Sequence, residues 1–464
     1  MEKRKAAGLS LTIIVILISF CIPGNTYLDV KGIRTVGVLV SFLIMLVTEA
    51  LPVVVTSLVY CGLMPLLGIT ENLAEALSGY SQPIVFFTLA SFGIAAALTE
   101  IPLSQRILRK LLEMFGQGIE SVLLAMMVAC AVFSSIVSNV PTCAIFMAIS
   151  LDFLKLYEDE TDRRKTGRAF MIAIPIASMI GGMMTPAGSS INLIAISQLE
   201  IYTGADISFI QWMVAGIPMS LVLIPLAWWL AIKIYKPVPV TKEKIQQFIN
   251  KMSEDIPEKL DVQERKVMVI VGSTLILWIT SSWISQINVM VVAILGCCLM
   301  FFPKVEVLNV DTFLRENSWD AFFLVGTVLS ISGAMIKNGV SDCIAGLIPV
   351  MNVSPQLLNA FVAVLIFVSL IVIPVATSLL PILSATLITV AVNAGASPAL
   401  IMMTAAFCAC NCYLLPLDTV PLITYSKGYY SMTDMAKSTI FLQITVVLLS
   451  AVWLPVLGKI VGLV

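Results

Sequence analysis

Apolar runs near or above the length that crosses a lipid bilayer recur along this chain, and they constrain its fold more than any other feature. A transmembrane helix needs about 20 predominantly apolar residues. Short polar stretches separate such runs from one end of the sequence to the other, and only 12% of the 464 residues are charged while 59% are hydrophobic. The sequence therefore predicts an all-α polytopic membrane protein that has no soluble domain of any size.

Eleven segments fit simple spans. They are 8–23, 33–48, 51–68, 83–99, 169–198, 207–233, 267–285, 287–302, 320–336, 398–423 and 438–462. The N-terminal segment lacks an A-x-A-like cleavage site, and many more spans follow it. We therefore expect it to be retained as a first helix, and not removed as a signal peptide.

Two further apolar segments, 119–151 and 356–395, do not fit simple spans. Each is too long for one crossing and barely long enough for two, and each has a polar or proline-bearing middle, around Ser138 and Pro141 in the first and Pro374 in the second. Non-helical backbone at membrane depth is tolerated where it is buried in protein or lines a water-filled cavity. We interpret both segments as re-entrant hairpins.

Lysine and arginine predict the orientation, because basic loops stay on the cytoplasmic side. If the basic residues 3–5 are cytoplasmic, the parity of eleven spans puts the clusters 106–110 and 162–168 and the polar segment 236–266 on the same side. The prediction is a plasma (inner) membrane protein with a cytoplasmic N-terminus and an extracytoplasmic C-terminus. The segment 236–266 is expected to hold a connecting amphipathic helix.

The two halves of the chain look related. Residues 81–107 align without a gap with residues 318–344, at an offset of 237. Five spans per half make the second half enter from the opposite face, so we expect an inverted repeat with discontinuous helices at mid-membrane, which is typical of secondary transporters. The predicted divisions are a first helix 1–32, a first repeat 33–235, a cytoplasmic linker 236–266 and a second repeat 267–464.

A second polar stretch, GGMMTPAGSSINLIAIS at 181–197, interrupts an apolar span. Its glycines and Pro186 disfavour continuous helix, so we expect residues 181–192 to be unwound. An unwound segment exposes carbonyls, hydroxyls and the Asn192 amide, and neutral oxygens of this kind can satisfy Na⁺ without a carboxylate. A mere kink for packing is the alternative here and at the corresponding stretch of the second half, and packing of small hydroxyl residues between helices is the alternative at the first hairpin tip.

The corresponding stretch of the second half is 411–421, which contains Asp418 between Pro416 and Pro421. An ionisable residue inside a membrane segment is costly and is functional by default. Asp418 is a candidate to ligate a cation, to carry a proton or to pair with Lys427. Alternatively the span ends early and Asp418 caps a helix.

Several classes of function are disfavoured. A net charge of −1 without a long basic run gives no support for nucleic-acid binding, and the ten cysteines have no histidine beside them to complete a usual metal set. Neither HExxH, GxSxG nor GxxxxGK[ST] occurs, so neither an enzyme nor an ATP-driven pump is indicated.

At the first hairpin tip and the two unwound stretches, the chain resembles the divalent anion/sodium symporter family, the di- and tricarboxylate carriers. Ser138-Asn139-Val140 is similar to the family's Ser-Asn-Thr at a hairpin tip, and residues 189–192 stand where the family has Thr-Pro-Pro-Asn. Residues 48–69 resemble its Thr-Glu-Ala-hydrophobic-Pro element. In the second half Val375-Ala376-Thr377 and residues 419–422 depart from both motifs, and Asp418 is an extra carboxylate.

The resemblance implies a homodimer in which each protomer has a scaffold domain and a transport domain that moves like an elevator. It places the substrate between the two hairpin tips, with sodium sites beside it. The implied substrate-binding residues are Ser138, Asn139, Thr142, Ser189, Ser190, Thr377, Ser378 and Thr419. The implied first sodium site comprises Ser138, Asn139, Gly182, Thr185 and Asn192, and a second cation site comprises Thr377 and Asp418.

The function expected from these observations is secondary active transport of small organic dianions, di- or tricarboxylates, by sodium-coupled symport. Loss of the second Ser-Asn-Thr leaves alternatives open: a sodium-independent or proton-coupled anion exchanger, or a carrier of an inorganic oxyanion. The absence of histidine weakens the case for proton coupling, although Asp418 is still a candidate proton carrier.

Overall fold

Helices make up the regular structure of the computed structural model, which describes residues 2–116, 118–254, 259–284, 286–347, 354–372 and 376–463, and no strand occurs in these ranges. The first half contains α1 (Glu2–Cys21), α2 (Val30–Thr48), α3 (Val53–Leu66), α4 (Leu73–Ala76), η1 (Ser78–Ser81), α5 (Pro83–Thr99), α6 (Leu103–Phe115), α7 (Ile119–Val137), α8 (Asn139–Leu154), α9 (Glu160–Gly182), η2 (Pro186–Gly188), α10 (Ser190–Thr203) and α11 (Phe209–Tyr235). The second half contains α12 (Lys242–Glu254), α13 (Val262–Thr280), α14 (Val289–Leu299), α15 (Val310–Glu316), α16 (Trp319–Lys337), α17 (Val340–Leu347), α18 (Pro355–Val372), α19 (Ala376–Asn393), α20 (Pro398–Cys410), α21 (Thr419–Tyr425) and α22 (Met432–Val461). The all-α class predicted from the sequence is confirmed.

Five described helices are by themselves long and apolar enough to cross a bilayer, namely α2, α7, α11, α16 and α22. The pair α5 and α6 meets the same criterion together, with a bend of 62° between the two helices. Shorter apolar helical segments of 10–17 residues accompany them, comprising most of α1, α18 and α19 together with α3, α8, α14 and α20. Length and composition thus support a multi-pass membrane protein, whereas the expected eleven spans and two re-entrant hairpins stay predictions.

Capping residues set where several helices begin. Asp29 precedes α2 and accepts a hydrogen bond of 2.7 Å from the Gly32 N–H. Ser208 before α11 and Ser431 before α22 each form a capping box with the side chain three residues later. Such caps satisfy backbone N–H groups that have no partner inside the helix. The polar residues between apolar runs therefore fix the helix starts.

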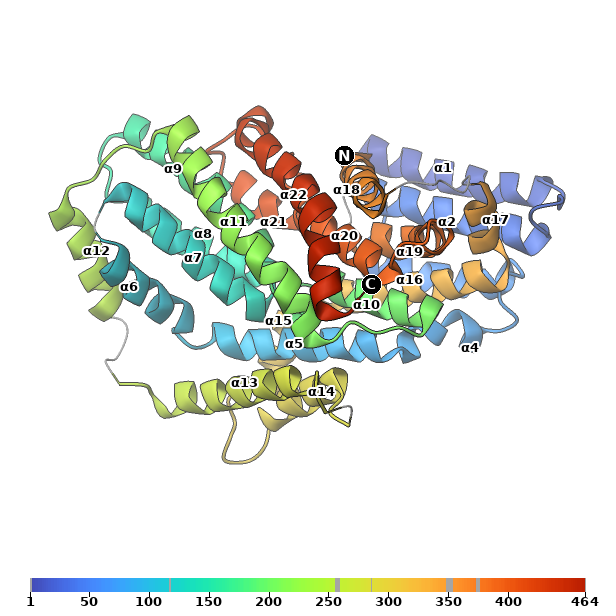
Figure 1. Ribbon diagram of the computed structural model, residues 1–464, viewed down its shortest axis with the longest axis horizontal. Coiled ribbons are helices and arrows are strands. Elements are labelled where there is room, and N and C mark those ends of the chain that lie inside the picture. The colour runs from blue at the N-terminus through green and yellow to red at the C-terminus, as the bar shows by residue number, and fades with distance from the viewer. Residues whose placement is uncertain are drawn as a thin grey trace.

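Two clusters of buried apolar side chains form the interior. The smaller cluster is built mainly from α2, α3 and α16, and the larger one extends over α5 to α14 and α18 to α22. Helix α16 belongs to both, because Leu324 and Val328 lie in the smaller cluster while Val325 and Leu329 lie in the larger. Figure 1 shows α1, α2, α16 and α17 gathered at one end of the molecule, with α6, α7, α8 and α12 at the other.

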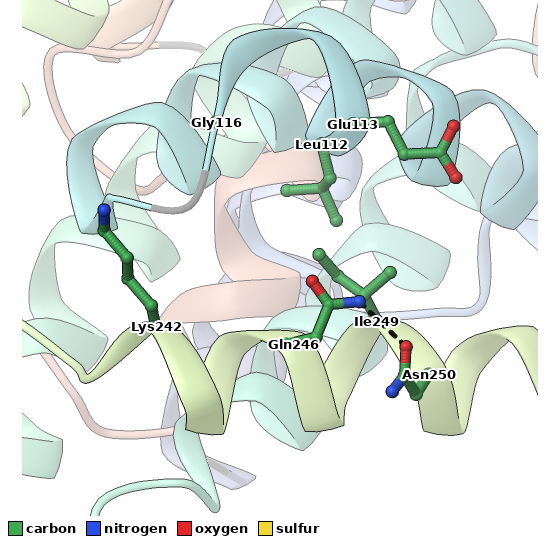
Figure 2. Close-up of a pocket in the computed structure, with 7 residues that line it drawn as sticks. All are labelled: Leu112, Glu113, Gly116, Lys242, Gln246, Ile249 and Asn250. Atoms are coloured by element: carbon green, nitrogen blue, oxygen red, sulfur yellow. Dashed lines mark hydrogen bonds between the residues drawn. The ribbon is translucent and has the colours of Figure 1, made fainter.

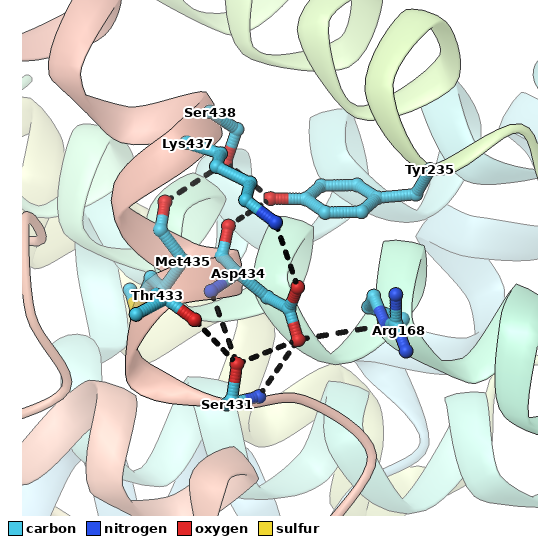
Figure 3. Close-up of polar contacts among 8 residues, drawn as sticks. All are labelled: Arg168, Tyr235, Ser431, Thr433, Asp434, Met435, Lys437 and Ser438. Carbon is cyan, nitrogen blue, oxygen red and sulfur yellow. Dashed lines mark hydrogen bonds and ion pairs between the residues drawn. The ribbon is translucent and has the colours of Figure 1, made fainter.

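A polar junction ties three helices of the larger cluster together (Figure 3). The carboxylate of Asp434, in the first turn of α22, lies 3.7 Å from the charged nitrogens of Arg168 on α9 and Lys437 on α22. The hydroxyl of Tyr235, at the end of α11, lies 2.6 Å from the backbone oxygen of Asp434 and 2.8 Å from Ser438 Oγ. These contacts hold the ends of α9, α11 and α22 in one unit.

One helix start recurs at the offset of the sequence alignment. Leu103 begins α6 and Val340 begins α17, and these two residues lie 237 positions apart. The inverted repeat itself stays a prediction.

Some boundaries differ from those expected. Helix α2 already begins at Val30, inside the predicted first segment 1–32, because Asp29 caps it there. The predicted linker 236–266 holds α12 and the first turn of α13. Ile245 and Ile249 of α12 are buried in the larger cluster, so this linker is packed against the rest of the protein. The middle of the second predicted hairpin, residues 373–375, lies outside the described residues.

Candidate functional site

The chain breaks between α7 and α8 at Ser138. Its backbone has φ 91° and ψ 155°, in a region that residues other than glycine rarely adopt. Asn139 follows directly as the first residue of α8, and its side chain is buried. The break therefore places a hydroxyl, an amide and the free N–H groups of the first turn of α8 at one point inside an apolar bundle.

Hydroxyl groups on two helices hold Asn139. Ser134 Oγ on α7 donates to Asn139 Oδ1 at 2.9 Å and lies 3.2 Å from Ser178 Oγ on α9. Ser178 Oγ in turn donates to the backbone oxygen of Asn139 at 2.8 Å. Ser134 and Ser178 are fully buried. They link the tip of the α7–α8 pair to α9.

Beyond the Ser138 tip, the chain is also interrupted between α9 and α10, over residues 183–189. This interruption is shorter than the expected 181–192, because α9 continues through Gly182 and α10 begins at Ser190. Thr185 Oγ1 donates to the Ser135 oxygen at 2.6 Å and accepts from the Gly188 N–H at 3.0 Å. We call residues 183–189 the first break, which is thus joined to α7 beside the Ser138 tip.

Three carbonyls at the first break, those of Gly182 at the end of α9 and of Met183 and Thr185, are already engaged. Asn192 Nδ2 donates to the oxygens of Gly182 and Thr185, both at 2.8 Å. Trp212 Nε1 on α11 donates to the Met183 oxygen at 3.0 Å. Asn192 and Trp212 are fully buried. Unwinding therefore leaves none of these three carbonyls without a partner.

Gly182 is required by a close approach. A Cβ built on this residue would overlap Asn139 Oδ1. Gly182 thus brings the α9 backbone against the amide oxygen at the Ser138 tip, so that this oxygen and the Gly182 and Thr185 carbonyls belong to one small region. These are neutral hard oxygens, the ligand type that suits a hard cation, and their chemistry fits Na⁺.

The second half breaks between α20 and α21, over residues 411–418, which we call the second break. The expected stretch 411–421 is too long, because Thr419 already belongs to α21. Asp418 is the cap of α21: its Oδ1 accepts from the Val420 N–H at 3.1 Å and from Thr419 Oγ1 at 3.3 Å. Among the described side chains, Asp418 forms no ion pair with Lys427 or any other base.

The two breaks touch. Cys410 Sγ, at the end of α20, donates to Asn192 Oδ1 at 3.2 Å. Asn411 Nδ2 lies 2.9 Å from Met183 Sδ in the first break. Breaks more than 200 residues apart in sequence are therefore in direct contact within the apolar interior.

The remaining predicted residues have different surroundings. Ser189 is buried, its Oγ accepting from the Ile191 N–H at 3.3 Å, and Ser190 is half-buried. Thr142 is fully buried in the first turns of α8, and its Oγ1 has no hydrogen-bond partner in the described part of the chain. Thr419 is exposed, and Thr377 is half-buried in the first turn of α19. The side chain of Ser378 lies outside the described residues.

Sequence reasoning missed Ser134 and Ser178, which support the Ser138 tip, and Trp212, which supports the first break. Ser134 stands four residues before Ser138, on the same face of α7, and this spacing is the one available signal for its role. Ser178 and Trp212 lie in apolar helices with no distinguishing pattern. Their contacts follow from packing and are not visible in the sequence.

A cavity of about 420 Å³ lies elsewhere, between α6 and α12 (Figure 2). Glu113 and Lys242 line it with opposite charges, and Gln246 donates to Asn250 along its α12 wall at 2.8 Å. None of the predicted site residues takes part. The candidate site is therefore the meeting point of the two breaks, and not this cavity.

Paired helix breaks that meet inside an apolar helical bundle define the class of secondary transporters. The chain belongs to the family described as the sodium:sulfate symporter transmembrane region, whose model matches residues 3–464. This membership places it among transporters and not among enzymes, and it agrees with the resemblance inferred from the sequence.

Curated relatives agree with this assignment, and two solved transporter structures share the fold. The sodium-dependent dicarboxylate transporter SdcS of Staphylococcus saprophyticus is 27% identical over 94% of this chain and 88% of its own length. The SdcS of Staphylococcus aureus strain USA300 is 27% identical over 88% of this chain and 82% of its own length. The YdaH transporter of Alcanivorax borkumensis superposes with a TM-score of 0.55 over 80% of this chain and 84% of its own at 13% identity. MtrF of Neisseria gonorrhoeae superposes with a TM-score of 0.60 over 98% of this chain and 96% of its own, at 11% identity. At such identities these two structures show the fold alone.

Proposed function

We propose that this chain carries small organic dianions, di- or tricarboxylates, across the plasma membrane by sodium-coupled symport. The observation that carries the proposal is the contact between the two helix breaks, where neutral oxygens and helix N-termini converge in an apolar interior. The staphylococcal relatives are named sodium-dependent dicarboxylate transporters, which supports the substrate class and the coupling ion.

The first sodium site comprises Ser138, Asn139, Gly182, Thr185 and Asn192. Close packing of Gly182 against Asn139 Oδ1 supports it, as does the hydrogen bonding of Ser134 that fixes this amide. Within the described residues no group of three or more His, Cys, Asp or Glu side chains gathers as a metal site. A monovalent hard cation held by amide and carbonyl oxygens needs no such group.

The anion would be held without a lysine or arginine. Helices α8 and α10 begin at the Ser138 tip and at Ser190, and the positive ends of their dipoles favour a negative charge. Ser138, Asn139, Thr142, Ser189 and Ser190 are the substrate-binding residues of this half. Thr377, Ser378 and Thr419 are those of the other half.

A second cation site at Thr377 and Asp418 completes the proposal. One carboxylate oxygen of Asp418 caps α21, and a cavity of about 10 Å³ lies beside the residue, lined also by Leu370 and Cys412. A cavity of this size is near the minimum for one water molecule. A carboxylate contributes more to a hard cation than the neutral groups that the second hairpin tip lacks.

Movement of the site across the membrane is proposed to be elevator-like, in a homodimer of inverted repeats with the N-terminus cytoplasmic and the C-terminus extracytoplasmic. The bundle that holds the breaks would move as one body. The polar junction at Asp434, which ties α9, α11 and α22, supports such rigidity.

Uptake into proteoliposomes tests the proposal. Purified protein should accumulate labelled succinate when the outside buffer contains Na⁺ and the inside K⁺, and should fail to do so with K⁺ on both sides. Thermal stabilisation by succinate should likewise require Na⁺. Equal uptake with and without Na⁺ would contradict the coupling, and no uptake of any dicarboxylate would contradict the substrate class.

An inorganic oxyanion is the second candidate substrate, because the family description itself names sulfate. Tetrahedral sulfate and an extended dicarboxylate place their charges differently. Competition by excess unlabelled sulfate in the same uptake assay separates the two. A proton gradient that drives uptake without Na⁺ would favour the exchanger alternative.

A further inference from the structure

The carboxamide of Asn192 touches both breaks at once. Its nitrogen donates to the oxygens of Gly182, the last residue of α9, and of Thr185 in the first break, and its oxygen accepts from the Cys410 thiol, which directly precedes the second break. The side chain is fully buried. A single rigid planar group therefore connects the two halves of the molecule.

The surroundings fix which end of the amide faces which break. Two carbonyl oxygens lie on one side of the group, and a second acceptor oxygen placed against them would be repelled. On the other side the thiol is a donor, although a weak one. In the described arrangement the nitrogen must therefore face the first break and the oxygen must face Cys410.

A cation reverses this preference. Na⁺ bound by the Gly182 and Thr185 oxygens would repel the N–H groups that now point at them, and it would attract the amide oxygen. Rotation of the amide by half a turn about its last single bond exchanges the two ends without moving the backbone. The nitrogen then faces the Cys410 sulfur, whose proton loses Asn192 Oδ1 as its acceptor and turns to the neighbouring Ser189 hydroxyl.

We propose that the Asn192 amide is a two-position relay, which turns when a cation enters the first break and thereby switches the hydrogen bond of Cys410 at the end of α20. The inference deepens the proposed sodium coupling and rests on it. Asn192 then acts on the second half as a positioning residue, because Cys410 directly precedes the second break.

The relay would make the arrangement of the substrate site depend on whether sodium is bound. Asn411, the first residue of the second break, contacts Met183 of the first break. A change at Cys410 thus acts on a segment that is already packed against the cation site. Coupling between ion and substrate needs an element of this kind, with two arrangements that a ligand can bias.

Infrared difference spectroscopy tests the relay, because the S–H stretching band reports the hydrogen bond that a thiol donates. The spectrum of purified full-length protein in NaCl, minus that in KCl, should contain an S–H band pair. This pair should vanish in Cys410→Ala and in Cys410→Ser, the latter covering the case in which alanine prevents folding. It should persist in Cys408→Ala, a matched control on the same helix whose buried thiol lies 3.9 Å from Ser450 Oγ.

Sodium titration of thermal stability supplies a second measurement. Loss of the thiol hydrogen bond removes a contact that favours the sodium-free arrangement. Cys410→Ala should therefore lower the sodium concentration at half-effect by about two- to fivefold, and Cys408→Ala should leave it unchanged.

The outcomes separate the relay from the proposed function. Stabilisation by Na⁺ without an S–H difference band, or with a band that survives in Cys410→Ala, would overturn the relay and leave sodium binding intact. An unchanged sodium midpoint in Cys410→Ala would count against it in the same way. Failure of Na⁺ to stabilise the wild-type protein would overturn both proposals.

Discussion

The first and second breaks occupy corresponding places in the two halves, yet they satisfy their polar groups differently. In the first break Ser134, Ser178, Asn192 and Trp212 form hydrogen bonds with the tip and the unwound carbonyls. In the second half Asn411 Oδ1 and the Tyr413 hydroxyl are fully buried without a hydrogen-bond partner among the described residues. Hydrogen bonds are made at the second break too, from Asn411 Nδ2 to the Phe407 oxygen and from Gln443 Nε2 to the Asn411 oxygen, and Thr142 Oγ1 of the first half is itself without a described partner. The comparison teaches that hydrogen bonds hold the Asn139 amide and the carbonyls beside it in the first half, whereas the second break leaves two buried polar atoms without a described partner.

Removing the amide at the centre of the cradle should have the largest effect. Asn139→Ala deletes Oδ1 and leaves the buried Ser134 hydroxyl without its acceptor, so sodium-dependent uptake should fall by about 10- to 100-fold, in line with about 1–3 kcal/mol for such a loss. Initial rates across a range of Na⁺ concentrations measure this. Asn250→Ala, an exposed asparagine on α12, is the matched control. Unchanged sodium dependence in Asn139→Ala would refute the first cation site.

Adding a side chain at Gly182 should have the next largest effect. Gly182→Ala forces a methyl group into Asn139 Oδ1, and overpacking of this kind costs about 1–3 kcal/mol. We expect a lower melting temperature together with weaker stabilisation by Na⁺. In the control Gly333→Ala, a Cβ meets nothing within 4 Å, and the melting temperature should stay the same. Equal behaviour of the two variants would show that the approach of α9 to the tip does not matter.

Removing the negative charge of Asp418 in the second half should have a moderate effect. In Asp418→Asn the new amide oxygen can still cap α21, so stability should change by less than about 0.5 kcal/mol. The half-saturating Na⁺ concentration should rise by about three- to tenfold, and uptake at varied Na⁺ measures it. Asp29→Asn, at the cap of α2, controls for loss of a capping charge. Wild-type ion dependence in Asp418→Asn would remove the carboxylate from the mechanism.

The smallest effect is expected at Tyr413. Its buried hydroxyl forms no hydrogen bond that the structure describes, so Tyr413→Phe should change the free energy of unfolding by less than about 1 kcal/mol and can even stabilise the protein. Chemical denaturation in detergent gives this value. A drop in uptake comparable with that of Asn139→Ala would mean that the second half is as highly organised as the first.

Local chemistry made the places of helix interruption predictable. Proline, glycine and hydroxyl residues within apolar runs marked the Ser138 tip and the region of the first break, and helices end at both. Exact limits depended on packing: Gly182 stays helical because α9 approaches Asn139, and Thr419 is helical because Asp418 caps α21. The hydrogen bond of Asp418 to the Val420 N–H shows that it caps α21, while its roles as a cation ligand or a proton carrier stay predictions.

Contacts between distant segments were not predictable in this way. The hydrogen bond from Cys410 to Asn192 joins residues 218 positions apart, and a cysteine in an apolar helix carries no sequence signal for such a partner. Ser178 and Trp212 likewise act through helix packing. Periodicity and breaker residues determine local structure, whereas the partners of buried polar atoms depend on the three-dimensional arrangement.

Helix α16 packs into both apolar clusters through neighbouring residues, with Leu324 and Val328 on one side and Val325 and Leu329 on the other. Because this one helix is shared, loss of packing in either cluster removes contacts of a helix on which the other also depends. Unfolding of the two interiors is thus expected to be coupled. Any relative displacement of the clusters must be accommodated as shear along the two faces of this helix.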